Sequence, residues 1–399
     1  MTLTWEPTIA TYGARVERFP YKAYVPDEIA SLQLSIGTQL ATDLVAAERA
    51  VAELQQQAAV TGLEALARPL LRAEGVASSM IEGLQISQRR VAQALFDPSL
   101  ADATAQFVVG NIRAMEQAIE IGSQQRAITV DDIFAMHHEM LQITRDANLA
   151  GLIREQPIWI GGQSSSPRTA EFVPPPWQEV PRLMADLCDF VNRTDLPAMI
   201  QAAVAHAQFE TIHPFMDGNG RIGRCLIHVI LRRRQTAPTF IPPVSVILAS
   251  NSRTYVRGLT SFRAGEFEDW CSIFVAATKT AAERATQLAD QLAAAKRAWY
   301  DRAKPRRGST ASRILDTLAA EPILDVATVH QRLGVSEQAA RLALLDLEKA
   351  GVIRQLNVGR YRRAYAATEV FDLVNRFEAD AADAGDAQRR RPSPAREVT

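Results

Sequence analysis

The chain has few cysteines, almost no net charge and no long apolar run, and each shortage excludes a class of protein. Its 399 residues contain three cysteines, Cys188, Cys225 and Cys271, which are scattered without the close spacing of a metal site. Such sparse cysteines are typical of free thiols in a reducing compartment rather than of a disulfide-stapled secreted domain. The formal net charge is -1, so no global field draws the chain to nucleic acid or to an anionic membrane.

The sequence also lacks targeting and membrane signals. The N-terminal stretch MTLTWEPTIATYG has no charged segment followed by an apolar one, and no apolar run approaches membrane-spanning length. Apolar residues make up 47% of the chain and charged residues 22%, a composition typical of a globular protein, and the length of 399 residues predicts two or three domains. We therefore expect a cytoplasmic protein that does not contact membranes.

Helical periodicity dominates what is present. Ala, Leu, Glu and Gln recur at helical spacing from residue 28, and further helical segments follow as far as residue 301. One stretch is extended instead: PIWI and AEFV flank a Gly/Ser/Pro-rich loop within residues 157–173 and predict a β-hairpin. A basic linker, KPRRGSTAS at 304–312, precedes a small unit with its own apolar periodicity. Residues 378–399 are of low complexity and are predicted to be disordered.

The stretch HPFMDGNGRIGR, residues 213–224, concentrates the residue types of a phosphate site. Its three glycines let the backbone turn tightly and approach a ligand closely. An amphipathic helix follows at once, and the exposed N–H groups and dipole at its N-terminus favour an anion. Arg221 and Arg224 would be unfavourable in the first turns of such a helix unless an anion, such as a polyphosphate, offsets them.

The other polar residues of this stretch supply chemistry. Asp217 is a ligand type for a hard cation such as Mg²⁺, which binds few carboxylates together with water and substrate phosphates. Asn219 could donate its amide to a phosphate oxygen, and His213 can accept a proton near neutral pH. Together they predict transfer of a phosphorus-centred group to a nucleophile that His213 deprotonates. The stretch is not a P-loop, because no Lys–Ser/Thr pair ends it and no strand precedes it.

At this point a family resemblance is visible. HPFMDGNGRIGR resembles the Fic signature, HPFx[D/E]GNGRxxR, at every fixed position. Fic proteins are α-helical enzymes, most of which transfer AMP from ATP to a hydroxyl of a target protein. The resemblance implies that His213 is the general base, that Asp217 binds Mg²⁺ and that Phe215 packs to position the loop. It also implies an anion hole and phosphate contacts, the last of them to the γ-phosphate, in this order along the chain: Gly218, Asn219, Gly220, Arg221 and Arg224. The predicted hairpin resembles the family's flap, which aligns an extended target segment by strand addition.

A second motif, SSMIEG at 78–83, has two interpretations. From composition alone, Glu82 is the last charged residue of a helix that Gly83 ends. The segment also resembles the Fic inhibitory motif, [S/T]xxxE[G/N], with Ser78, Glu82 and Gly83 at the fixed positions. The resemblance implies that Glu82 pairs with Arg224 in the place of the γ-phosphate, so that ATP binds only unproductively. In some family members this glutamate also assists removal of AMP, and the sequence leaves that open.

Several other polar residues have weaker assignments. His206 is expected to be structural, and Arg154, just before the hairpin, is expected to be an ion-pair partner. Tyr255 and Trp270 either line the adenine site or belong to the core. No metal-ligand spacing includes His137.

Residues 308–366 resemble a winged helix-turn-helix, a domain often appended to Fic proteins. A helix from Val326 meets a turn at Gly334, and a second helix begins after Ser336, which is an N-cap candidate. That second helix carries little positive charge beyond Arg341. The predicted wing adds four arginines: Arg354, Arg360, Arg362 and Arg363. DNA binding through the second helix and a protein-interaction or dimerisation role therefore stay equally open.

We expect an all-α protein, a Fic helical bundle with a β-hairpin flap followed by a small winged helix-turn-helix domain. The expected divisions are an N-terminal helical region with the inhibitory helix, a catalytic domain, a winged domain and a disordered tail, at 1–110, 111–303, 304–377 and 378–399. The expected function is an autoinhibited protein adenylyltransferase that uses ATP and Mg²⁺ and modifies Ser, Thr or Tyr hydroxyls of target proteins and of itself. The alternatives are another nucleotidyl or phosphoryl transfer, deAMPylation, or a nucleotide-sensing DNA-binding regulator. The target and the oligomeric state, a homodimer included, stay open.

Overall fold

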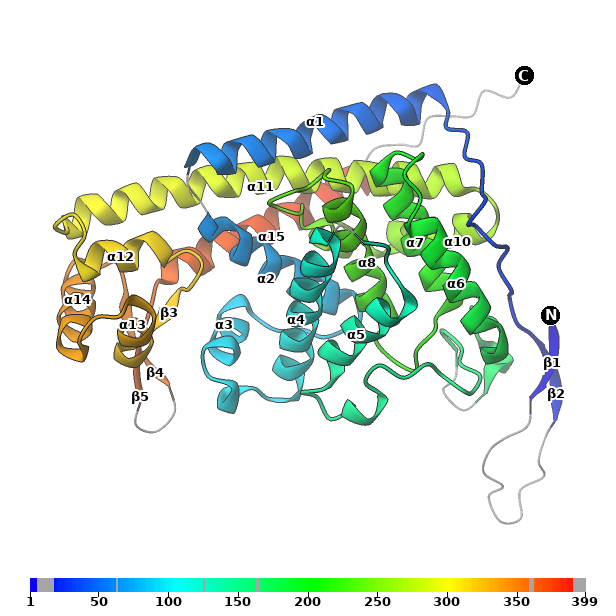
Figure 1. Cartoon of the computed structure of the whole chain (residues 1–399), viewed down its shortest axis with the longest axis horizontal. Helices are drawn as coiled ribbons and strands as arrows, with labels where there is room; N and C mark the ends of the chain where they lie inside the picture. Colours follow the sequence, from blue (N-terminus) through cyan, green and yellow to red (C-terminus); the bar gives the residue numbers. More distant parts are fainter. Residues whose placement is uncertain (6–17, 62–63, 125, 163–165, 359–361, 390–399) are drawn as a thin grey trace, which may run out of the picture.

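The computed structural model describes residues 1–5, 18–61, 64–124, 126–162, 166–358 and 362–389. Most of these residues are helical, and the strands form two small sheets (Figure 1). In the first sheet β1 (Thr2–Trp5) pairs with β2 (Phe19–Lys22) in antiparallel register. Within the described ranges, no helix combines the length and the apolar character needed to cross a membrane.

Two deeply buried helices form the centre of a helical bundle. Every residue of α7 (Ala198–Ile212) is buried, and α8 (Asn219–Arg233) is buried from Asn219 to Leu231. A helix without an exposed face belongs in the core of a large domain, where neighbours cover it on all sides. The surrounding helices are α4 (Ala103–Ser123), α5 (Val130–Leu141), α6 (Val180–Val191) and α10 (Ser252–Arg263). The loop that joins α7 to α8 is therefore anchored in the core at both ends.

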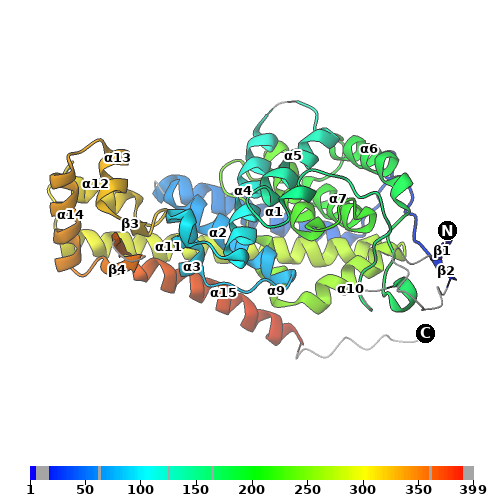
Figure 2. The same cartoon turned by 90° about the horizontal axis from the view of Figure 1, so that it is seen from below.

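Two long helices lie side by side along the bundle, α1 (Thr38–Thr61) and α11 (Phe267–Ala303) (Figures 1 and 2). The first begins later than the expected residue 28. The backbone N–H groups of Ile29 and Ala30 donate to the Asp186 carboxylate at 2.7 and 3.0 Å, and these bonds hold the segment before α1 in a non-helical conformation against α6.

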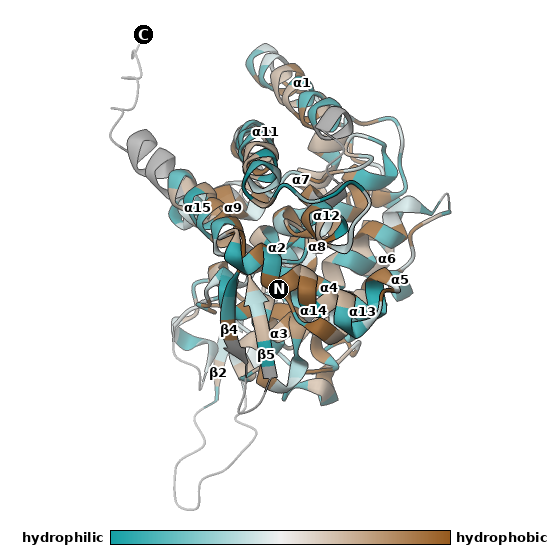
Figure 3. Ribbon diagram, turned by 90° about the vertical axis from the view of Figure 1, so that its left-hand side faces the viewer, coloured by the Kyte–Doolittle hydropathy of each residue, from teal (hydrophilic) through white to brown (hydrophobic). Residues whose placement is uncertain are grey.

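Helix α2 (Glu64–Ile81) packs against α4, α8 and α9 (Val244–Ser250), and α3 (Gln88–Phe96) follows it. The C-terminal helix α15 (Thr368–Arg389) packs against α11, which Figure 3 shows between α1 and α15. The predicted disorder of 378–399 is wrong for residues 378–389, which belong to this helix. Gln88 Nε2 donates to Glu378 at 2.6 Å and Ala381 is buried, so the segment has packing partners that low complexity conceals. Residues 390–399 lie outside the described ranges.

The C-terminal unit contains three helices and a three-stranded sheet ordered β3–β5–β4. Its elements are α12 (Thr310–Thr317), β3 (Ile323–Leu324), α13 (Val326–Leu333), α14 (Glu337–Lys349), β4 (Arg354–Val358) and β5 (Arg362–Ala366). Gly334 ends α13 with a φ of 62°, and the Ser336 side chain caps α14 by accepting from the Ala339 N–H, as the sequence predicts. Arg360 of the predicted wing lies outside the described residues.

Candidate active site

The loop between α7 and α8 is shaped by unusual backbone conformations. His213 ends α7 with a φ of 51° and Gly218 precedes α8 with a φ of 81°, both in the left-handed region. Asn219 then closes the loop, because its Oδ1 accepts from the Phe215 N–H and its Nδ2 donates to the Phe215 carbonyl, both at 2.8 Å. The side chain of Asn219 therefore fixes the loop, while the second N–H of its amide could still donate to a phosphate oxygen, as the sequence predicts.

Phe215 attaches the loop to α5. Its buried ring stacks on the His137 ring with centroids 3.7 Å apart and an interplanar angle of 2°. The Gly151 N–H donates to His137 Nδ1 at 3.0 Å, so the neutral ring carries its proton on Nε2, which lies 3.1 Å from the Asp217 carbonyl oxygen. Burial lowers the pKa of His137 to about 4 and so favours this neutral form. His137 thus positions the loop, a role that no sequence signal revealed because its partners are distant in sequence.

His213 presents an imidazole prepared to accept a proton. Its side chain is 18% exposed, and its Nδ1 lies 3.2 Å from the Glu210 carbonyl oxygen. A proton on Nδ1 satisfies that carbonyl and leaves Nε2 as the acceptor. Burial lowers the pKa of His213 to about 4, so the ring is neutral at pH 7. The neighbouring Glu210 carboxyl, whose pKa burial raises to about 7, has one oxygen 3.9 Å from Nδ1.

Asp217 and Arg221 form an ion pair at the start of α8. Arg221 Nη2 donates to Asp217 Oδ2 at 3.1 Å, and the Asp217 side chain remains 49% exposed. The Arg221 guanidinium is buried, and within the described part of the chain its Nε and Nη1 have no hydrogen-bond partner. Buried donors without partners are unfavourable, so this guanidinium keeps unused capacity for an anion.

Arg224 is fully buried and is held by the end of α2. Its Nε donates to Ser78 Oγ at 2.8 Å, while its Nη2 donates to the Ser78 carbonyl at 2.8 Å and to Glu82 Oε1 at 2.7 Å. Gly83 follows with a φ of 82° and ends the helical turn, as the sequence predicts. The Glu82 carboxylate lies so close to Gly220 that a Cβ there would collide with it. This carboxylate therefore sits at the N-terminus of α8, where N–H groups and the helix dipole favour an anion.

The structure gives different positions to Trp270 and Tyr255, the two residues expected either in the adenine site or in the core. Trp270 is a core residue, buried with its Nε1 donating to the Ala203 carbonyl at 2.7 Å. Tyr255 is also buried but its hydroxyl contacts both His206 Nε2 at 2.9 Å and Arg224 Nη1 at 3.4 Å. Tyr255 therefore contacts the Arg224 guanidinium and also lines the cavity that the loop borders.

The expected ion-pair role of Arg154 is wrong for the described residues. Its Nε donates to the His213 carbonyl at 2.8 Å and its Nη2 to the Pro175 carbonyl at 2.6 Å. Its backbone N–H also donates to the Pro214 carbonyl at 2.9 Å. A guanidinium has five donors, so it can satisfy several loop carbonyls that otherwise lack partners. Arg154 thus ties the segment before the predicted hairpin to the loop.

The loop borders a cavity of about 550 Å³. Its wall includes Glu82, His213, Asp217 and Gly220 together with four residues of the flap, Trp159, Ile160, Glu171 and Phe172. The strand pairing of the flap is shorter than in the expected hairpin, because the described residues form one antiparallel bridge, Ile160–Phe172. Gly161 and Gly162 have φ values of 74° and 71°, and a 3₁₀ turn follows at Pro167–Thr169, so extended pairing does not continue. Residues 163–165 lie outside the described ranges.

Family comparisons agree with this geometry. Residues 127–231 match the model of the Fic/DOC family, and residues 41–120 match the model of the Fic/DOC family N-terminal region. The chain contains a Fic/DOC domain. A crystal structure of a Fic family protein from Desulfovibrio desulfuricans G20 covers 84% of this chain and 97% of its own, with 24% sequence identity and a TM-score of 0.52. This likeness confirms the expected α-helical Fic fold.

The curated relatives of the Fic/DOC domain carry one description. Over 125 residues the chain is 32% identical to protein adenylyltransferase fic-1 of Caenorhabditis briggsae, which covers 31% of this chain and 23% of the relative. Over 122 residues it is 33% identical to protein adenylyltransferase Fic of Drosophila willistoni, which covers 30% of this chain and 22% of the relative. The chain thus spans less than a quarter of the length of these relatives.

Proposed function

We propose that this protein is a protein adenylyltransferase that transfers AMP from ATP to a hydroxyl of target proteins. The observation that carries the proposal is the convergence on one cavity of a neutral His213, the exposed Asp217 carboxylate and the anion-binding N-terminus of α8. The Fic/DOC relatives, which are named protein adenylyltransferases, support the same activity. The hydroxyl belongs to Ser, Thr or Tyr of another protein or of this chain.

The transfer balances without a further reactant. The target hydroxyl oxygen attacks the α-phosphorus of ATP, and its proton passes to Nε2 of His213. The bond from the α-phosphorus to the oxygen that bridges to the β-phosphorus breaks, and pyrophosphate leaves. Arg221 and Arg224 offer guanidinium forks that match phosphate oxygens. The flap residues that line the same cavity would align the target segment beside His213.

The residues present fit one Mg²⁺ ion. Asp217 offers an exposed carboxylate at the cavity wall, and Mg²⁺ is commonly held by one or two carboxylates, water and substrate phosphates. In the described ranges no three His, Cys, Asp or Glu side chains gather as a metal cage, so Asp217 and the nucleotide would hold the ion together. When bound, Mg²⁺ would offset phosphate charge during transfer.

We further propose that Glu82 inhibits this reaction. Its carboxylate occupies the α8 N-terminus and bonds Arg224, the positions that the γ-phosphate would need. ATP that enters beside Glu82 would lack the Arg224 contact and would place its α-phosphorus away from His213. Displacing Glu82 towards solvent, whatever signal causes it, would free both the Arg224 guanidinium and the N-terminus of α8 for the nucleotide.

Labelled nucleotides test the proposed activity. A Glu82→Gly variant should transfer label from α-labelled ATP to protein and leave γ-label in solution, and His213→Ala in that background should transfer neither. Transfer of γ-label instead would establish phosphotransfer, preference for UTP or GTP would change the substrate, and release of AMP from pre-labelled protein would establish deAMPylation. Asp217→Asn should lower the transfer and raise the Mg²⁺ concentration that it requires, because asparagine keeps the side-chain size but loses the carboxylate that would hold the ion.

We also propose that residues 304–377 form a winged helix-turn-helix. The helices α13 and α14 followed by the antiparallel strands β4 and β5 support this assignment. Binding of the full chain to duplex DNA, weakening steeply with salt, would favour the alternative of a nucleotide-sensing regulator. If the full chain does not bind duplex DNA even at low salt, the role that remains for this unit is protein interaction.

A further inference from the structure

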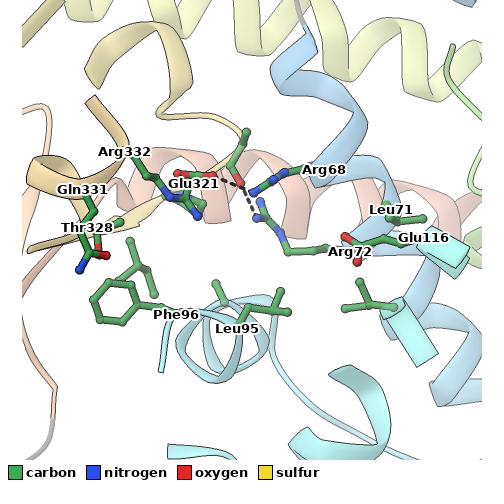
Figure 4. Close-up of a pocket in the computed structure, with 15 residues that line it drawn as sticks. Arg68, Leu71, Arg72, Leu95, Phe96, Glu116, Glu321, Thr328, Gln331 and Arg332 are labelled. Atoms are coloured by element: carbon green, nitrogen blue, oxygen red, sulfur yellow. Dashed lines mark hydrogen bonds and ion pairs between the residues drawn. The ribbon is translucent and has the colours of Figure 1, made fainter. Parts of the chain in front are cut away.

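A second cavity lies between the N-terminal helices and the C-terminal unit. Its volume is about 390 Å³, which lies within the range of small-molecule sites. One wall comes from α2, α3 and α4, and the other from residues 320–332 of the C-terminal unit (Figure 4). It shares no lining residue with the cavity beside the catalytic loop. Neither the Fic/DOC signature nor the proposed transfer uses it.

Three arginines line this cavity with incomplete compensation. Arg68 Nη1 lies 2.7 Å from Glu321 Oε1, and Arg332 contacts the other oxygen of the same carboxylate. Arg72 is 7% exposed, and its Nη1 donates to the Ala320 carbonyl at 2.7 Å. In the described part of the chain Arg72 has no carboxylate partner. One carboxylate thus serves two guanidiniums while a third, buried one has only a carbonyl.

The titration behaviour of these groups agrees with an excess of positive charge. Burial, to which the charge of Arg68 adds, lowers the pKa of Arg72 to about 10 and also lowers the pKa of Arg332. Glu116 is the other acid of the wall, and burial raises its pKa. Cations that lie close together in a recess are stabilised by an added anion.

The opposite side of the cavity is apolar. Figure 4 shows Phe96 and Leu95 of α3 across from Arg72 and Glu321. An apolar floor with a few convergent polar groups is typical of a site for an organic ligand rather than a bare ion. A guanidinium fork matches the oxygens of a phosphate.

We propose that this cavity binds a small organic phosphate, with its phosphate held by Arg68, Arg72 and Arg332 and its apolar body against Phe96 and Leu95. The incoming phosphate takes over the two guanidiniums that Glu321 now bridges. The ligand therefore joins α2 to the C-terminal unit through its own oxygens in place of the Glu321 carboxylate.

The same helix connects this cavity to the catalytic loop. Arg68 and Arg72 belong to α2, which carries Ser78 in its last turn and leads directly into Glu82. A ligand that moves or orders α2 therefore alters the segment that holds Arg224. This consequence for activity rests on the proposed function, whereas binding to the cavity does not.

Calorimetric titration of the full chain with phenyl phosphate tests the binding. We expect saturable binding that Arg72→Gln and Arg332→Gln each weaken by at least about tenfold, because each removes a charged hydrogen-bond donor. The side chain of Arg332 is half exposed, so that variant keeps its fold even if Arg72→Gln does not. Arg224→Gln, which alters the catalytic anion site, should weaken the binding less than Arg332→Gln does, since Arg224 does not line this cavity.

Three results would overturn the binding proposal. The first is no binding by the wild type at about 10 mM phenyl phosphate, a concentration at which even a weak millimolar site fills. The second is binding that Arg224→Gln abolishes and Arg332→Gln does not. The third is equal affinity for inorganic phosphate, which would mark an ion site without specificity for an organic ligand. Hydrogen exchange of residues 76–84 tests the connection to α2. Exchange that phenyl phosphate changes in the wild type but not in Arg332→Gln supports the connection, and unchanged exchange on saturation excludes it, independently of any transfer activity.

Discussion

Glu82 Oε1 lies 2.7 Å from Arg224 Nη2, although the two residues are 142 positions apart. The pair is asymmetric, because the Arg224 side chain is 0% exposed whereas that of Glu82 is 36% exposed. Removing one partner of a fully buried pair costs about 3–5 kcal/mol, and solvent around Glu82 makes this pair weaker than that. The glutamate is therefore the partner that can leave, and a phosphate that replaces it would leave Arg224 paired.

Ser78→Ala is expected to raise AMP transfer less than Glu82→Gly does. The substitution removes the bond from Arg224 Nε to Ser78 Oγ but keeps the bond to the Ser78 carbonyl and the bond to Glu82. Loss of one charged hydrogen bond corresponds to an increase of roughly tenfold in the rate of AMP transfer. Ser79→Ala is the matched control, since Ser79 is buried on the same helix but donates to the Gly75 carbonyl instead. Equal activation by both substitutions would attribute the effect to a general loosening of α2.

His137→Phe is expected to lower transfer in the Glu82→Gly background. Phenylalanine keeps a ring stacked on Phe215 but cannot bond the Asp217 carbonyl or the Gly151 N–H. A loop displaced by a fraction of an ångström can lose about tenfold or more in rate. His138→Phe serves as the control, because His138 is exposed on the same helix. Unchanged transfer by His137→Phe, with an unchanged thermal midpoint, would remove His137 from the positioning role.

Acid is expected to destabilise the Fic/DOC domain. Burial lowers the pKa of His137 and His213 to about 4 and that of His206 to about 3, from an ordinary value of 6.5. Between pH 6.5 and 4 the unfolded chain therefore binds more protons than the folded chain, and the free energy of unfolding falls as pH falls. Scanning calorimetry at pH 7 and pH 5 should show a lower midpoint at pH 5. A midpoint that is independent of pH over this range would contradict neutral, buried histidines.

Glu210 contributes with the opposite sign. Burial raises its pKa from the ordinary 4.5 to about 7, so between these values the folded chain binds more protons than the unfolded chain and the free energy of unfolding falls as pH rises. Glu210→Gln should therefore remove this opposing contribution and enlarge the fall of the midpoint from pH 7 to pH 5. The same difference in midpoint between pH 7 and pH 5 in wild type and Glu210→Gln would contradict a raised pKa at Glu210.

The sequence was most informative where function resides in contiguous residues. The loop from His213 to Arg224 could be recognised because its chemistry and its backbone both depend on neighbouring positions. The pairing of Glu82 with Arg224 was predicted only through the family resemblance, since composition favours a plain helix end. The α-helical fold followed from periodicity, which reports the buried faces of helices directly.

Long-range side-chain contacts could not be predicted in the same way. His137 reaches the loop because α5 packs beside α8, and nothing in its local sequence distinguishes it from His138. The Asn219 amide is engaged by Phe215 because of the loop backbone, which residue types alone do not specify. Helix α15 extends to Arg389 because packing partners, including Gln88, override a low-complexity composition.

The most direct test of autoinhibited AMP transfer is the initial rate of protein labelling from α-labelled ATP in wild type, Glu82→Gln and Glu82→Gly. We expect the lowest rate in the wild type, an intermediate rate in Glu82→Gln, which keeps the side-chain size without its charge, and the highest rate in Glu82→Gly. Addition of His213→Ala to Glu82→Gly should return the rate to background. Equal rates in wild type and Glu82→Gly, or labelling that survives without His213, would contradict the account.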